Sequence, residues 1–135
     1  MLKNALAGAA LAFLVAAPSN AQPVPSPVQP PPVKRTILHR MDVPGTNLEV
    51  IFGSVEIAAG FKAGRHTHPG TVAVQVTEGD FWVHFDGESE RIVRTGEMLV
   101  VPDRAVHNEG ATDKPVKFTG VYLLEKGKPL ASPAP

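Results

Sequence analysis

The sequence has 135 residues, its 13 lysines and arginines are balanced by 13 acidic residues, and it contains no cysteine. Disulfides and thiolate metal ligands are therefore excluded, and a metal could be held only by imidazole, carboxylate, amide or water. The charges are scattered, with no basic stripe and no amphipathic helix. We therefore expect no nucleic-acid partner, and no membrane binding once the export signal described next is cleaved.

Residues Met1–Ala21 have the pattern of an export signal. Lys3 supplies a positive start, Ala5–Ala17 is almost entirely apolar, and Ser19-Asn20-Ala21 offers a cleavage site before Gln22. The apolar run is shorter than the ~20 residues needed to cross a bilayer. We therefore expect an exported protein, periplasmic or secreted; the alternative is an uncleaved anchor.

The remainder divides into a linker, one domain and a tail. Residues 22–33 are rich in proline, which favours an extended polyproline conformation and indicates a spacer. A docking peptide for a proline-recognising partner is the alternative. Residues 34–129 suffice for one hydrophobic core but not for two. Residues 130–135 are expected to form a loose tail.

The domain is expected to be all-β. Runs rich in valine, isoleucine and phenylalanine are separated by glycine, proline, aspartate and asparagine, and no stretch shows a sustained 3.6-residue apolar period. Asp86-Gly87 predicts a hairpin. The predicted strands are Lys34–Met41, Leu48–Ala58, Thr71–Thr77, Phe81–Phe85, Glu90–Val93, Met98–Val101 and Val116–Leu124. Short strands at such even spacing indicate a sandwich or a small barrel.

Three of the five histidines form a candidate metal site. His66 and His68 precede the apolar run Val72–Val76. In a strand, side chains at i and i+2 point to the same face ~7 Å apart, so two imidazoles can converge on one ion. His107 could complete the site if its strand or turn packs opposite. The ligand type does not distinguish iron, zinc, manganese, nickel or copper.

With these residues in place, the sequence resembles the cupins, which are small β-barrels of the jelly-roll type. The family's two motifs are G-x5-H-x-H-x3,4-E-x6-G and G-x5-P-x-G-x2-H-x3-N. The matching residues are Gly60, His66, His68 and Gly79 in the first motif and Gly96, Pro102 and His107 in the second. The resemblance implies a single-domain cupin barrel and a divalent metal ion bound by His66, His68 and His107.

Three positions depart from the family pattern. Val72 stands where many cupins have a metal-binding glutamate, Arg104 where the second motif prefers glycine, and Ala111 where it prefers asparagine. The loss of glycine implies a different turn at the mouth of the barrel. The loss of glutamate leaves a metal with three neutral ligands and a net charge of +2, which favours an anionic substrate. The alternative is a vacant pocket in which the histidines only fill polar positions.

Four further residues are candidates for the pocket: Val72, Gln75, Met98 and Arg104. Gln75 could replace the missing carboxylate only if a bulge turned it inward, and a surface position is the alternative. Met98 is placed on the pocket wall by alternation. Arg65 and Arg104 flank the two histidine segments and could guide an anion inward, or could simply be solvated.

Three functions are compatible with this pattern. The first is an exported metal-binding enzyme, dioxygenase-like or isomerase-like, that acts on a small polar or anionic molecule; no catalytic residue can be assigned. The second is a non-catalytic periplasmic module that binds a small ligand. The third is a structural role as a homodimer. The resemblance implies strand exchange for such a dimer, and Lys34–Met41 is suited to that.

Overall fold

The structure is a computed structural model that describes residues 31–135. The predicted export signal and nearly all of the proline-rich linker lie outside the described residues. Every regular element of the described chain is a β-strand, as the sequence predicts. The strands are β1 (Val33–Asp42), β2 (Leu48–Ile57), β3 (His66–Thr67), β4 (Gly70–Glu78), β5 (Phe81–Phe85), β6 (Arg91–Val93), β7 (Met98–Val101), β8 (His107–Ala111), β9 (Val116–Glu125) and β10 (Ser132–Pro133).

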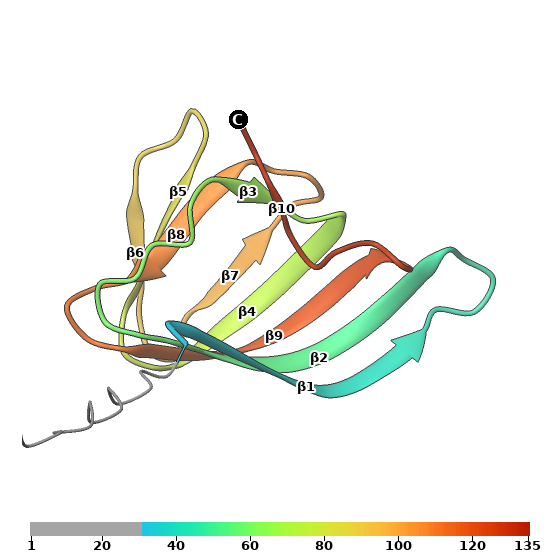
Figure 1. Ribbon diagram of the computed structural model, residues 1–135, viewed down its shortest axis with the longest axis horizontal. Helices are drawn as coiled ribbons and strands as arrows, with labels where there is room; N and C mark the ends of the chain where they lie inside the picture. The colour runs from blue at the N-terminus through green and yellow to red at the C-terminus, as the bar shows by residue number, and fades with distance from the viewer. Residues whose placement is uncertain (1–30) are drawn as a thin grey trace, which may run out of the picture.

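The strands form two antiparallel sheets that face each other (Figure 1). The larger sheet, whose strands are mostly longer, has the order β1-β2-β9-β4-β7. The smaller sheet has the order β10-β3-β8-β5-β6. Strands that follow one another along the chain often lie in different sheets, as β4 and β5 do, which is the connectivity of a jelly roll. The predicted all-β, jelly-roll architecture is therefore confirmed.

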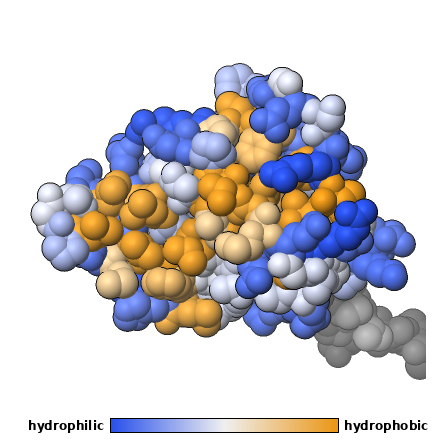
Figure 2. Space-filling view, turned by 180° about the vertical axis from the view of Figure 1, so that it is seen from behind, coloured by the Kyte–Doolittle hydropathy of each residue, from blue (hydrophilic) through white to orange (hydrophobic). Residues whose placement is uncertain are grey.

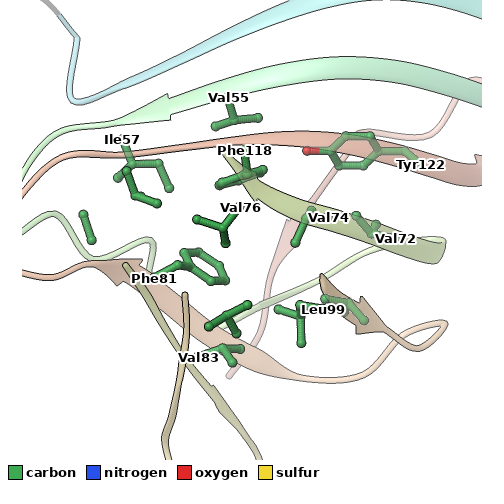
Figure 3. Close-up of a cluster of buried hydrophobic side chains, with 14 of the residues drawn as sticks. Val55, Ile57, Val72, Val74, Val76, Phe81, Val83, Leu99, Phe118 and Tyr122 are labelled. Carbon is green, nitrogen blue, oxygen red and sulfur yellow. The ribbon is translucent and has the colours of Figure 1, made fainter. Parts of the chain in front are cut away.

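The core lies between the sheets and follows from strict alternation along the strands. In β9, the residues from Val116 to Leu124 are buried at every second position, while Val121 and Leu123 on the other face are partly exposed. Each aliphatic side chain that is fully buried contributes ~1.5–3 kcal/mol. Figure 3 shows the central part of this core, with side chains from both sheets. Its labelled members include Val55, Val74, Val76, Phe81, Val83, Leu99 and Phe118.

Exposed apolar side chains remain on both edge strands of the larger sheet. On β1, which is an edge strand, Ile37, Leu38 and Met41 are 45%, 62% and 50% exposed. Met98 and Val100 on β7 are exposed at the opposite edge. Figure 2 shows apolar side chains gathered on the molecule as seen from behind. No helix among residues 31–135 is long and apolar enough to span a membrane.

The C-terminal residues, expected to form a loose tail, are part of the fold. Ser132 pairs with Thr67 and Pro133 with His66, which adds β10 to the edge of the smaller sheet. Leu130 packs against the core. The expectation was wrong because a two-residue strand is too short to show an alternating apolar pattern in the sequence. Hydrogen bonding to β3, and not the β-propensity of Ser132 and Pro133, holds β10 in place.

We predict that Gly79→Ala is much more destabilising than Gly87→Ala. Both glycines have a positive φ, 76° and 80°. A methyl group at residue 79 would meet the carbonyl oxygen of Pro115 at 2.4 Å, whereas residue 87 has nothing within 4 Å. We expect a loss of about 1–2 kcal/mol for Gly87→Ala and of a further ~1–3 kcal/mol for Gly79→Ala. Urea unfolding measures both, and equal losses would contradict the steric account.

Candidate metal centre

Three histidines from neighbouring strands lie together between the sheets. His66 in β3 pairs directly with His107 in β8, and His68 follows immediately after β3. The ring centroids are 4.2 Å apart for His66 and His107, and 5.1 Å and 5.2 Å apart for the two pairs that include His68. All three are buried, and one nitrogen from each lies within 4.8 Å of the other two. The structure thus brings together the histidines that the sequence predicts to converge.

Each imidazole is held in place by a backbone carbonyl group. The Nδ1 atoms of His66, His68 and His107 lie 2.8, 2.5 and 2.9 Å from their carbonyl oxygens. The three acceptors, in the same order, are Gly64, Leu130 and Ala105. Because a carbonyl oxygen can only accept, each Nδ1 donates its hydrogen, and each neutral ring keeps a lone pair on Nε2. Metal-binding histidines are oriented by partners of this kind.

One nitrogen of the cluster has no hydrogen-bond partner. His107 is fully buried, and its Nε2 is the one unpaired buried polar side-chain atom among residues 31–135. An unpaired group of this kind costs ~1–3 kcal/mol. Binding to a cation would satisfy it, and three neutral imidazoles suit zinc, copper, iron and nickel. The residues present therefore fit a divalent metal ion.

A carboxylate that the sequence reading missed, Glu109, borders the three imidazoles. One of its oxygens lies 3.4 Å from Nε2 of His107 and the other lies 3.9 Å from Nε2 of His66. The shorter contact does not have hydrogen-bond geometry. The signal was available in the sequence. The i, i+2 rule that places His66 and His68 on one face also places Glu109 with His107.

Burial and the carboxylate have opposite effects on the histidines. Burial lowers the pKa of His68 from 6.5 to about 4, although its hydrogen bond to Leu130 favours the charged form. Burial also opposes charge on His107, but the Glu109 carboxylate outweighs it and raises the pKa of His107. The same attraction overcomes burial at Glu109 and lowers the pKa of its carboxyl group. The cluster therefore contains an ionised carboxylate at neutral pH.

His68 and Glu109 face a cavity of about 330 Å³ between the sheets. Most of its lining is apolar, and the other polar side chains in it belong to Arg35 and Tyr122. Burial raises the pKa of Tyr122, so its hydroxyl group stays protonated at neutral pH. In Figure 3 this hydroxyl points from β9 toward Phe118, into the space between the sheets. The cavity thus combines apolar walls with a few polar groups, as small-molecule sites do.

The family model for a cupin domain matches residues 53–122, which is more than half of the chain. The chain belongs to the cupin family. The matched segment contains the three histidines, Glu109 and most of the cavity wall. A comparison with curated proteins gives no match.

Solved structures of two cupin or cupin-like proteins and of a lyase have a similar fold. A cupin-like protein from Thermotoga maritima is 26% identical with a TM-score of 0.61, covering 76% of this chain and 75% of that one. A cupin superfamily protein from Desulfitobacterium hafniense is 17% identical with a TM-score of 0.59, covering 69% and 78%. The DMSP lyase DddQ from Ruegeria pomeroyi is 16% identical with a TM-score of 0.57, covering 63% and 43%. At 16–17% identity, the likeness is evidence for the fold alone.

Two of the departures from the cupin motifs can be followed in the structure. Val72 is buried and lines the cavity, so the position of the usual glutamate offers only a methyl surface. Arg104 has a φ of 55°, the one positive φ of a non-glycine residue in the described chain. The different turn expected at Arg104 is therefore not found, because the arginine adopts the left-handed conformation that glycine favours, at a cost of ~1–2 kcal/mol.

The other three residues predicted for the pocket lie outside the cavity. Gln75 and Met98 point to solvent, since the inward positions of β7 are Leu99 and Val101. Alternation separates the two faces of a strand but does not say which is inward. Arg104 is exposed and forms an ion pair with Glu125.

The two flanking arginines and the two histidines outside the predicted site also lie away from the cavity. Arg65 forms an ion pair with Asp86, and neither flanking arginine lines the cavity. Arg35, which the sequence did not suggest, lines the cavity instead. His39 and His84 are exposed strand residues.

We predict that the metal-free protein loses stability through His68 as the pH falls. The unfolded chain binds the proton near pH 6.5, whereas the folded chain does so only near pH 4, so stability declines between these values. The loss should reach about 3 kcal/mol. Urea unfolding in a chelator, at pH 7 and at pH 4.5, measures it. In His68→Gln the free energy of unfolding should change less between the two pH values than in wild type, whereas the exposed control His84→Gln should behave as wild type does. The same change in wild type and in both variants would contradict the account.

Proposed function

We propose that this cupin is an exported protein that binds one divalent metal ion through His66, His68 and His107. We further propose that it acts on a small polar or anionic molecule in the adjoining cavity. The observation that carries the proposal is the shared orientation of the three rings. Each ring donates Nδ1–H to a backbone carbonyl and keeps Nε2 for a ligand, and one Nε2 is buried without a partner.

A metal bound at these histidines would supply Lewis-acid polarisation of an oxygen on the bound molecule or, if it were iron, dioxygen chemistry. The residues of the chain do the positioning. The neutral Tyr122 hydroxyl can donate a hydrogen bond into the cavity, and its ring centroid lies 6.2 Å from that of His68. Arg35 offers a positive charge in the cavity wall. The apolar side chains around the buried Tyr122 strengthen its hydrogen bonds, whereas Arg35 is exposed to solvent.

Isomerase-like or dioxygenase-like chemistry remains the proposed reaction class. A protonated Tyr122 close to His68 supports an isomerase, because its hydroxyl group could donate a hydrogen bond to a substrate oxygen on which negative charge develops. One cupin-fold neighbour is a DMSP lyase, which is a precedent for small-molecule chemistry in this fold. The apolar cavity wall supports the second candidate, a non-catalytic module that binds a small ligand. Turnover of candidate substrates would separate the two.

Export and self-association are also proposed. The N-terminal sequence supports a periplasmic or secreted location. A homodimer is supported by the edge strand β1, which exposes Ile37, Leu38 and Met41. Exposed apolar side chains on an unpaired edge favour association with another chain.

We predict that protein purified from its own compartment contains roughly one divalent metal per chain, as three-histidine sites do. His66→Ala and His107→Ala should each abolish the bound metal while the fold is retained, since each removes one of three ligands. Elemental analysis and circular dichroism measure these outcomes, with exposed His84→Ala as the matched control. Wild-type protein that takes up no metal, even when zinc or iron is added, would refute the proposal.

We also predict that ending the chain at Pro129 weakens metal binding about 10- to 100-fold. The truncation removes the carbonyl of Leu130, the acceptor that orients His68, and the pairing of β10 with β3. Isothermal titration with zinc measures the affinity. As the control, a chain ending at Ala131 keeps the Leu130 carbonyl. If the chain ending at Pro129 bound as tightly as the full chain, the carbonyl would have no role in orienting His68.

A further inference from the structure

We propose that Glu109 is the fourth protein ligand of this metal centre and replaces the carboxylate that the first cupin motif lacks at Val72. The inference rests on the proposed function, because it assumes that the three histidines bind a metal. The family pattern places the carboxylate ligand in the first motif. Here it would come from the second motif, where Glu109 follows His107 on β8.

The carboxylate approaches the histidines from the side that faces a ligand. Each of its two oxygens lies near a different Nε2, at 3.4 Å from His107 and at 3.9 Å from His66. A carboxylate that only oriented these rings would contact Nδ1, but both Nδ1 atoms are already bound to backbone carbonyls. Glu109 therefore lies beside the Nε2 atoms of His107 and His66, where it could share an ion with them.

The separations match ligands that share one ion. Zinc lies ~2.0–2.2 Å from nitrogen and oxygen ligands, so neighbouring ligand atoms in tetrahedral or octahedral geometry are ~3–3.5 Å apart. The contact of Glu109 with His107 falls in this range, and the contact with His66 exceeds it by a few tenths of an ångström. The tight cluster itself contains only the three imidazoles, and the carboxylate borders it on the His66 and His107 side.

The backbone fixes Glu109 in this position. Its N–H donates to the side-chain oxygen of Asn108, and its C=O accepts from the N–H of Ala63. The next residue, Gly110, lets the chain at Phe61 come close, since a Cβ there would lie 2.1 Å from the Phe61 oxygen. The side chain of Glu109 is only 14% exposed. Among residues 31–135, no lysine or arginine lies within ion-pair distance of Glu109, and a buried carboxylate of this kind fits a ligand to a cation.

The assignment changes the charge of the centre. A divalent ion on three neutral imidazoles would keep a net charge of +2, whereas with Glu109 the net charge is +1. The weaker positive field lowers the pKa of bound water less and attracts an anionic substrate less strongly. Anion recognition then depends more on Arg35, the one cationic side chain other than histidine that lines the cavity in the described chain.

The test compares the metal-binding affinity of four proteins, using zinc titration calorimetry and the visible absorption of the cobalt form. Glu109→Gln keeps the size and removes the charge. Glu109→Asp keeps the charge and withdraws it by one methylene group. Glu49→Gln is the matched control, because Glu49 is a buried carboxylate, 6% exposed, that does not line the cavity.

We expect both Glu109 variants to bind zinc ~10- to 100-fold more weakly than wild type and to change the cobalt spectrum, with Glu49→Gln unchanged in both. Wild-type affinity and spectrum in Glu109→Gln would overturn the ligand assignment while leaving the three-histidine site intact. Weakening in Glu109→Gln but not in Glu109→Asp would also overturn it, because Glu109 would then act only through its field. If wild type bound no metal at all, the proposed function and this inference would both fail.

Discussion

The pairing of β3 with β8 joins two motifs that lie about forty residues apart in the sequence. It places His66 opposite His107 and brings His68 within reach of both. Gly110 permits the close approach of the chain at Phe61, and β10 covers the other edge of β3. The candidate centre is thus built from backbone pairing, and the side chains need only follow the alternation of the strands.

Hydrogen bonds to backbone carbonyls determine which ring nitrogen of each histidine is available to a metal ion. With Nδ1 donating in every ring, the three Nε2 lone pairs converge in a buried place where one of them has no partner. The ionised Glu109 adds a negative charge to that place. A bound cation would accept the lone pair of His107 Nε2 and would also offset the buried negative charge of Glu109. Metal binding should therefore stabilise the folded chain.

The sequence predicted the fold well and the site in part. The long strands follow from alternation and turn residues, and the converging histidines follow from their spacing. The strand β8, with the sequence His-Asn-Glu-Gly-Ala, carries no β-branched residue and forms only because β5 and β3 pair with it. Glu109 was missed for that reason. Met98 was placed inward because alternation alone leaves the phase of a strand undetermined.

The most direct test of the account is anomalous diffraction at the zinc edge from crystals of the protein grown with zinc. We predict one peak between the two sheets, bound by Nε2 of His66, His68 and His107 and by a carboxylate oxygen of Glu109. A peak bound by these four atoms would establish the centre and its ligand set. The absence of a peak there, or a peak bound through Nδ1, would contradict the account.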